Sequence, residues 1–159
     1  MKLMAGTSKH ELERLYLDRY THFVRVAAAI AGDEDRAVDA VQEAFATALR
    51  VRRSFRGEGP LEAWVWRIVV NAARRSRRPP EDLPIDHVAV SDNGADPAPV
   101  RRAIAGLPER QRLVLFLRYY ADLEYGAIAD ALEIAPGTVA ATLHAAHTSL
   151  HSALEEARP

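Results

Sequence analysis

Apolar residues recur every three or four positions along most of the chain, which is the period of an α-helix that buries one side. The first such stretch runs from about Ser8 to Ala31 and ends at Gly32. A second begins in the acidic run at Asp33, where carboxylates suit the positive end of a helix dipole, and continues to about Arg53. Because no stretch alternates at period two long enough to form a sheet, the pattern predicts an all-α protein.

A third predicted helix, from Leu61 to Arg78, follows a glycine- and proline-rich turn and has two distinct sides. Its apolar side comprises Leu61, Val65, Ile68, Val69 and Ala72. An adjacent stripe carries Trp64, Arg67, Asn71, Arg74 and Arg78. Cations, an amide and an aromatic ring suit an unpaired nucleic-acid strand, because phosphates need positive charge and free bases need stacking surfaces. For this helix alone, a core helix with a solvated basic rim is an equally good interpretation.

The segment that follows, Pro79 to Pro99, contains five prolines, five acidic residues and no lysine or arginine, which is typical of a linker. Beyond it we expect helices at about Val100–Gly106, Pro108–Tyr120, Glu124–Leu132 and Pro136–Glu156. A three-residue connection makes the last two a helix-turn-helix candidate. The predicted organisation is two small helical domains, at residues 1–78 and 100–159, joined by an acidic, proline-rich linker at 79–99.

Composition narrows the functional classes. With 159 residues, 48% of them apolar, the chain can form a folded core. It has no apolar run that could span a bilayer or serve as a signal peptide, so we expect a cytoplasmic protein without a membrane partner. It has no cysteine, no pairing of a nucleophile with a base and no phosphate-binding glycine loop. We therefore expect neither an enzyme nor a cofactor.

The net charge of −1 conceals two oppositely charged regions. The stretch from Arg50 to Arg78 holds nine arginines against two glutamates, a balance of +7. From Tyr119 to Ala157 there are six acidic residues and no lysine or arginine, a balance of −6. This asymmetry indicates different partners for the two halves.

Several short motifs occur in a specific order along most of the chain. They are the Asp39–Phe45 run, the Phe55–Leu61 turn, the Trp64–Asn71 helix, the Leu107–Arg112 run, Ile128-Ala129, and Gly137-Thr138-Val139 followed by Leu143-His144. In this order and spacing, the chain resembles bacterial extracytoplasmic-function sigma factors. That resemblance implies an alternative sigma factor that joins core RNA polymerase and directs transcription from selected promoters, and it makes an anti-sigma protein an expected partner.

The resemblance also implies roles for individual residues. Asp39, Gln42 and Glu43 would dock on the clamp helices of RNA polymerase, although a solvated helix side is the usual meaning of such a face. The residues expected to contact promoter DNA are Arg56, Trp64, Arg67, Asn71, Arg74, Arg75 and Arg78 in the first domain, and Thr138 and Thr142 in the second. Those of the first domain would hold the melted minus-ten strand, so that binding itself shifts the duplex toward opening.

The last helix departs from the family pattern. Where family members usually carry lysine, serine and arginine to read the minus-thirty-five element, this chain has Ala140, Ala141 and Thr142. Its helix start is weakened too, because Ala135 occupies a capping position where serine is common. Without cations the helix loses most phosphate attraction and its strong guanine contacts. We therefore expect weakened or altered minus-thirty-five recognition.

Two accounts of the second domain stay open at this stage. It binds promoter DNA weakly, helped by Arg110, Arg112 and Arg118, or it serves as a docking module for protein. The second account leads to an alternative function, that of a sigma-like regulator acting mainly through contacts with polymerase or an anti-sigma protein. His144, His147 and His151 lie at helical spacing, but without a matching carboxylate we expect surface histidines rather than a metal site.

Overall fold

The computed structural model describes residues 6–77 and 98–158, and within these ranges its regular elements are all helical. The first half contains α1 (Lys9–Ala31), α2 (Glu34–Val51), a 3₁₀ turn (Arg52–Ser54) and α3 (Leu61–Arg75). The second half contains α4 (Ala98–Ala105), α5 (Glu109–Tyr119), α6 (Tyr125–Leu132) and α7 (Pro136–Glu156). The all-α prediction is confirmed. Residues 78–97, which hold most of the predicted linker and Arg78, lie outside the described residues.

The helix ends follow the local signals in the sequence. At the start of α1 the Ser8 hydroxyl accepts a hydrogen bond from the Glu11 amide at 3.1 Å, and the Glu11 carboxylate accepts one from the Ser8 amide at 2.8 Å. This reciprocal capping satisfies two amides that the helix itself cannot pair. Gly32 ends α1 in the left-handed region, at φ 78°. The carboxylate of Asp33 then caps α2 by accepting from the Arg36 amide at 3.0 Å.

Helix α4 differs slightly from its predicted range, because it begins at Ala98 rather than at Val100. Pro99 therefore lies in its first turn instead of in the linker. A proline is tolerated there, since the missing N–H would have no partner within the helix in any case.

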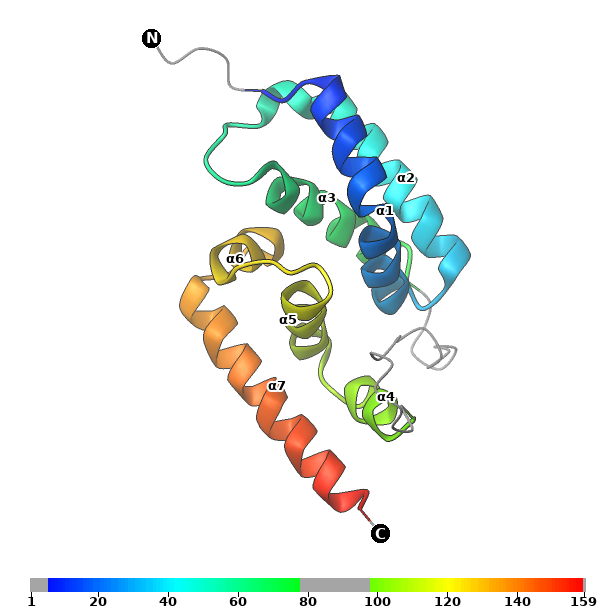
Figure 1. Cartoon of the computed structure of the whole chain (residues 1–159), viewed down its shortest axis with the longest axis vertical. Coiled ribbons are helices and arrows are strands. Elements are labelled where there is room, and N and C mark those ends of the chain that lie inside the picture. Colours follow the sequence, from blue (N-terminus) through cyan, green and yellow to red (C-terminus); the bar gives the residue numbers. More distant parts are fainter. Residues whose placement is uncertain (1–5, 78–97, 159) are drawn as a thin grey trace.

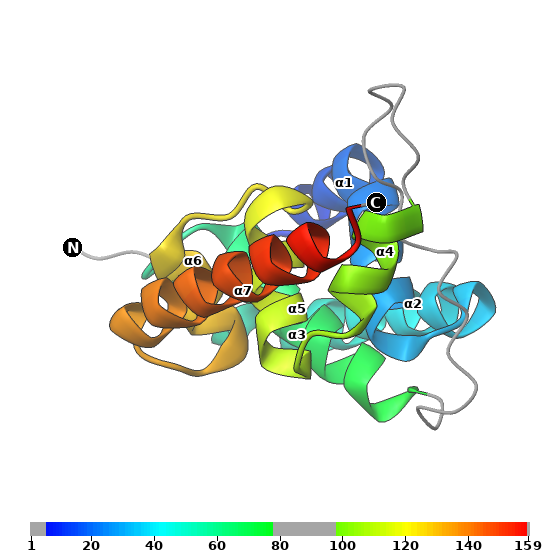
Figure 2. The same ribbon diagram turned by 90° about the horizontal axis from the view of Figure 1, so that it is seen from below.

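Helix α3 occupies the middle of the molecule (Figures 1 and 2). It packs against α1 and α2 on one side and against α6 on the other, while α7 packs against α4, α5 and α6. The indole of Trp66 is fully buried; its ring centroid lies 4.4 Å from that of Phe23, and its N–H donates to the Glu62 carboxylate at 3.3 Å. Contact on two sides explains why α3 buries more than the predicted apolar side.

That wider burial is the main difference between the predicted and observed core. Of the predicted apolar side, Leu61 and Ile68 are only half-buried. The helix instead also buries Ala63, Trp66, Val70 and Ala73. The sequence pattern identified α3 but not the second packing surface, because periodicity describes one helix and not its neighbours.

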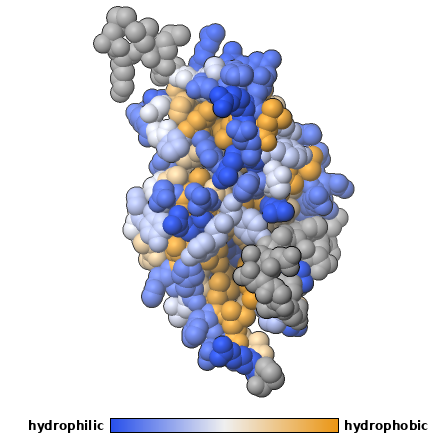
Figure 3. Space-filling model, viewed as in Figure 1, coloured by the Kyte–Doolittle hydropathy of each residue, from blue (hydrophilic) through white to orange (hydrophobic). Residues whose placement is uncertain are grey.

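The outer surface is mainly hydrophilic over α1 and α2, whereas apolar residues are visible along α7 at the other end (Figure 3). Leu17 on α1 is an exception in the first half, with 76% of its surface exposed. Within the described residues, none of the helices combines the length and the apolar character needed to cross a membrane.

Candidate nucleic-acid interface

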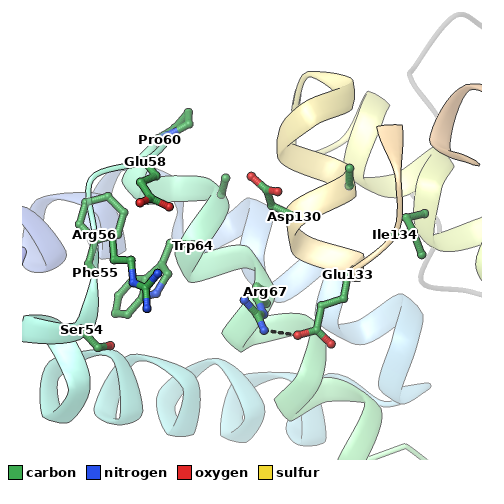
Figure 4. A pocket seen from close by; sticks show the side chains of 13 residues that line it. Ser54, Phe55, Arg56, Glu58, Pro60, Trp64, Arg67, Asp130, Glu133 and Ile134 are labelled. Atoms are coloured by element: carbon green, nitrogen blue, oxygen red, sulfur yellow. Dashed lines mark hydrogen bonds and ion pairs between the residues drawn. The ribbon is translucent and has the colours of Figure 1, made fainter. Parts of the chain in front are cut away.

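A pocket of about 640 Å³ opens where the loop before α3, the first turns of α3 and the end of α6 meet (Figure 4). The loop and α3 contribute aromatic and cationic side chains, among them Phe55, Arg56, Trp64 and Arg67. On the opposite side α6 and the following turn contribute Asp130, Glu133 and Ile134. The loop and α3 wall is aromatic and mainly cationic, although it also carries Glu58, whereas the α6 wall is acidic.

The aromatic wall is formed by Phe55 and Trp64, whose ring centroids lie 5.5 Å apart with the planes tilted by 52°. Both rings are half-buried, so each keeps an edge or face toward the pocket. Arg56 is exposed beside them on the loop. The loop turns at Gly57, which has φ 69°. Residues with a Cβ rarely adopt this backbone conformation. The turn thus brings a cation and two rings to the start of α3.

The described part of the predicted α3 stripe lies toward the second half of the chain, where Arg67 and Arg74 are engaged. Arg67 forms an ion pair with Glu133 at the end of α6. Arg74 contacts the carboxylate of Glu109 at 3.3 Å, and Arg77, just beyond α3, contacts it at 2.6 Å. These three pairs join cations of the first half to acids of the second. No pattern in the sequence indicated these contacts.

The Glu109 carboxyl responds to both its burial and its partners. Burial alone raises its pKa, because a charged group loses hydration. Hydrogen bonds and charge from Arg77 and Arg74 outweigh that effect, so the pKa of Glu109 lies below its ordinary value. The carboxylate form is therefore favoured while the two halves are in contact.

Asn71 and Arg75 are the other two α3 residues that were predicted to contact DNA. Asn71 is half-buried on the side between Arg67 and Arg74. Arg75 is exposed and contacts the Glu43 carboxylate of α2 at 3.2 Å. This pair links a residue predicted for DNA with one predicted for polymerase, but both side chains are more than half exposed and the contact is weak.

The predicted polymerase-facing side of α2 is exposed at Asp39, Gln42 and Glu43. Beside it, a largely apolar groove of about 480 Å³ runs between α1 and α2. The groove is lined by Leu12, Tyr16, Leu17, Phe45, Ala46 and Leu49, with Glu13 and Gln42 at its edge. Sequence reasoning missed this groove. The available signal was Leu17, which falls outside the apolar series Leu12, Leu15, Tyr16 and Tyr20.

Helix α7 has the neutral outer side that the sequence indicated. Ala140, Ala141 and His144 are exposed near its start, while Thr138 and Thr142 are half-buried. Its N-cap residue Ala135 provides no side-chain hydrogen bond. The imidazole of His147 lies 2.8 Å from the Tyr119 hydroxyl. Among the described residues, no three His, Asp or Glu side chains are grouped as metal ligands would be.

The arginines expected to assist α7 are largely occupied within the second half. Arg112 donates to the Ala105 carbonyl at 2.9 Å, and Arg118 donates to the Leu123 carbonyl at 3.1 Å. The Arg118 guanidinium also lies 5.7 Å from the centre of the Tyr125 ring. Arg110 is exposed. These contacts stabilise the loops around α5 and leave Arg110 as the freest of the three cations.

Comparison with known proteins assigns the family. The sigma-70 region 2 model matches residues 15–79, and the sigma-70 region 4 model matches residues 98–150. The RNA polymerase sigma-H factor of Pseudomonas aeruginosa is 32% identical over 145 residues, covering 77% of this chain and 75% of the relative. The extracytoplasmic-function (ECF) sigma-E factor of Escherichia coli K12 is 29% identical over 163 residues, covering 89% and 85%. The chain belongs to the ECF sigma factors.

The fold of this sigma factor agrees with that assignment. CnrH, solved in complex with the cytosolic domain of CnrY, superposes with a TM-score of 0.72 at 22% identity, covering 96% of this chain and 92% of CnrH. RpoE of Bartonella quintana, solved with the anti-sigma factor NepR, superposes with a TM-score of 0.67 at 23% identity, covering 95% and 100%. Both likenesses extend over both halves of the chain.

Family membership confirms the predicted function. This protein is an alternative sigma factor that acts with RNA polymerase at promoter DNA in transcription initiation. The alternative, a sigma-like regulator working mainly through protein contacts, is not favoured, because both the region 2 and the region 4 models match.

Proposed function

We propose that this sigma factor holds the unwound minus-ten strand in the pocket between the Phe55 loop and α3. The observation that carries the proposal is the wall on which two aromatic rings lie beside Arg56 and Arg67. A volume of about 640 Å³ is ample for a nucleobase. A flipped base would stack on Trp64 while the arginines contact its phosphates.

The energetics of stacking and unstacking are of the right size for promoter opening. Unstacking one base costs a few kcal/mol, and stacking it on an aromatic side chain returns about 1–3 kcal/mol. Phosphate contacts from Arg56 and the α3 stripe supply further attraction. Binding can therefore shift the duplex toward the open form without any chemical step.

The polymerase-facing residues, the domain limits and the α7 residues are also part of the proposal. The exposed side of α2 with Asp39, Gln42 and Glu43 would contact core polymerase, as its acid and amide groups suit a basic partner helix. The first domain would span 1–78, and the second would begin at Ala98, where α4 starts, rather than at the predicted limit of 100. Because α7 lacks cations, Thr138 and Thr142 would give at most weak recognition of the minus-thirty-five element.

An anti-sigma protein is a further proposed partner. Support comes from the fold likeness to RpoE, which was solved with its anti-sigma factor NepR.

The strand-capture proposal is tested in reconstituted holoenzyme with Trp64→Ala and Arg56→Gln. Each change should lower promoter opening, Trp64→Ala by roughly 5- to 150-fold, because stacking on one ring contributes about 1–3 kcal/mol. Trp64→Phe should retain most opening, since it keeps a ring. A fluorescent base within the minus-ten element reports the opening directly.

The control is Arg102→Gln, which removes an equivalent exposed charge from α4, away from the pocket. A second control is a promoter whose minus-ten region is mismatched and already open, where all variants should bind polymerase and start transcripts more equally. If Trp64→Ala opens the duplex as well as the parent protein does, the pocket is not the strand-binding site.

A further inference from the structure

The pocket in Figure 4 is built from both halves of the chain and has the size of a small-molecule site. Its volume of about 640 Å³ falls within the range of ligand pockets, which are common where two domains meet. Small residues line it at Gly59, Ala63 and Ala129, so little side-chain volume fills the space between its walls. The proposed function uses only the wall formed by the loop and α3. The α6 wall has no part in it.

The wall formed by the loop and α3 offers a ligand two rings and a cation. Phe55 and Trp64 are only half-buried, so a planar group can stack on their exposed parts. Arg56 is exposed and forms no ion pair within the described residues. Arg67, in contrast, is paired with Glu133 across the pocket. Arg56 is therefore the cation of this wall that is available to an anionic group such as a phosphate.

Two carboxylates are directed toward the space between the walls, Glu58 from the loop and Asp130 from α6 (Figure 4). In the part of the chain that the structure describes, neither forms an ion pair or a side-chain hydrogen bond. An ionised carboxylate accepts hydrogen bonds and donates none. A ligand that fits the pocket must therefore present amines or hydroxyls to these oxygens, in addition to an anion for Arg56.

A mononucleotide meets all of these requirements. Its base is a planar group for the rings, its phosphate suits a guanidinium, and its sugar hydroxyls are donors. Adenine and cytosine also carry an exocyclic amine, which can donate to the Asp130 carboxylate. Uracil and thymine have a carbonyl oxygen at the corresponding position, and that oxygen would face the carboxylate without a proton between them. The acidic α6 wall thus favours bases that carry an amine.

We propose that the free sigma factor binds an adenine or cytosine mononucleotide in this pocket. The base stacks on Phe55 and Trp64. The phosphate contacts Arg56, and the exocyclic amine donates to Asp130. This goes beyond the proposed function, because it concerns the chain without DNA or polymerase and uses the α6 wall. Because the ligand contacts both halves, its binding stabilises the folded chain by mass action, and the nucleotide acts on the sigma factor as a small-molecule effector.

The test titrates the full chain, without polymerase, with AMP, CMP, UMP and adenosine in a calorimeter. AMP and CMP should bind with a Kd of roughly 10 µM to 1 mM, as expected for a ligand of this size. UMP should bind at least about fivefold more weakly than CMP, because its carbonyl oxygen meets Asp130. Adenosine should bind about tenfold more weakly than AMP, because it has no phosphate for Arg56. AMP should also raise the Tm of the chain.

Two variants assign the contacts. Asp130→Asn should remove the preference for CMP over UMP, because an amide both accepts and donates hydrogen bonds. Arg56→Gln should weaken AMP binding about tenfold and change adenosine binding by less than about twofold. The matched controls, Asp18→Asn and Arg102→Gln, remove the same charges at exposed positions outside the pocket. They should change AMP binding by less than about twofold.

No heat of binding and no change in Tm with AMP at up to about 5 mM would overturn the inference. Equal affinities for CMP and UMP in the parent chain would overturn it too, because Asp130 would then not distinguish the bases. Trp64→Ala separates this inference from strand capture. If it abolishes AMP binding but leaves promoter opening unchanged, the nucleotide site is supported and strand capture is rejected. Reduced opening, in a protein whose parent chain does not bind AMP, gives the opposite result.

Discussion

Helices α3 and α7 both bury apolar residues, yet the exposed side of α3 is cationic and that of α7 is neutral near its start. Helix α3 carries Arg67, Arg74 and Arg75 around its exposed side, whereas α7 has no arginine or lysine along its whole length. In the proposed function α3 contacts the minus-ten strand, and α7 corresponds to the helix expected to read the minus-thirty-five element. Here the charge needed to bind DNA is concentrated in the first half, and the second half supplies acids that contact it.

The residues that fold these helices are therefore different from those that would contact DNA. The inner sides obey one rule, since α3 buries Trp66 and Val69 while α7 buries Val139 and Leu143. Loss of cations from the outer side of α7 therefore leaves its packing intact. A helix-turn-helix can keep its fold while its recognition surface becomes neutral, because packing and phosphate attraction depend on different residues.

The largest expected effect concerns the inner side of α3. Trp66→Ala should lower the free energy of unfolding by about 3–5 kcal/mol, because it empties a fully buried site packed on Phe23. Urea denaturation followed by far-UV circular dichroism measures this change. Trp64→Ala is the control, and it should cost less because Trp64 is half-buried on the outer side. Equal losses at the two positions would contradict the assignment of inner and outer sides.

The next prediction contrasts the two promoter elements. Scrambling the minus-ten element should lower transcription by at least about tenfold, because each lost base contact costs about 1–3 kcal/mol. Scrambling the minus-thirty-five element should change it by less than about threefold, since α7 offers alanines where strong base contacts need cations or amides. Run-off transcription with holoenzyme measures both. A large loss with the second promoter would mean that α7 reads DNA despite its neutral surface.

Adding positive charge to α7 tests whether the missing cations limit its binding to promoter DNA. Ala140→Arg with Ala141→Arg should strengthen holoenzyme binding to duplex promoter DNA and steepen its salt dependence by about 0.9 per new phosphate contact. Ser149→Arg with Ser152→Arg adds the same charge farther along α7, and both serines are exposed. That control should alter the salt dependence less. Equal changes would indicate a general charge effect rather than a site near the start of α7.

The local structure was predictable because its signals are local. Ser8, Gly32, Asp33 and Pro60 sit at helix ends whose chemistry is determined within a few residues. The exposed sides of α2 and α7 were also predicted, since helical period alone assigns them. For the same reason the family motifs could be placed on particular helices.

Contacts between distant helices were not predictable from the same information. Arg67 and Glu133 are 66 positions apart, and no periodicity relates them. The sequence indicated opposite charges in the two halves but not that they would meet on the candidate DNA surface. Burial of Trp66 was not predicted, because helical period describes only one apolar side. Since α3 packs against neighbours on two sides, residues beside the predicted apolar side are buried as well.

A pH titration tests how much the Glu109 carboxylate contributes to the contact between the two halves. Although burial raises it, the pKa of Glu109 is lowered overall by Arg77 and Arg74. Its contribution to this contact is therefore fully present above the ordinary carboxyl pKa and is lost as the pH falls through the lowered value. Because the sequence has no cysteine, Ala46→Cys on α2 and Ala140→Cys on α7 provide exposed positions for a fluorescent donor and acceptor. Energy transfer between them should decrease over that acidic range. Glu109→Gln should weaken this dependence, and circular dichroism confirms that the helices remain folded over the range compared.

The smallest expected effect concerns the start of α7. Ala135 already has the extended backbone of an N-cap, with φ −71° and ψ 148°, but its side chain cannot accept a hydrogen bond. Ala135→Ser should therefore raise the free energy of unfolding by about 0.5–1 kcal/mol, and Ser8→Ala at the capped start of α1 should lower it by about 1 kcal/mol. Thermal and urea denaturation measure both changes. If Ala135→Ser stabilises α7 but leaves promoter selectivity unchanged, the missing cations rather than the missing cap would account for the weak minus-thirty-five recognition that we expect. A gain in minus-thirty-five dependence from the cap alone would reverse that conclusion, because serine adds an amide partner and no charge.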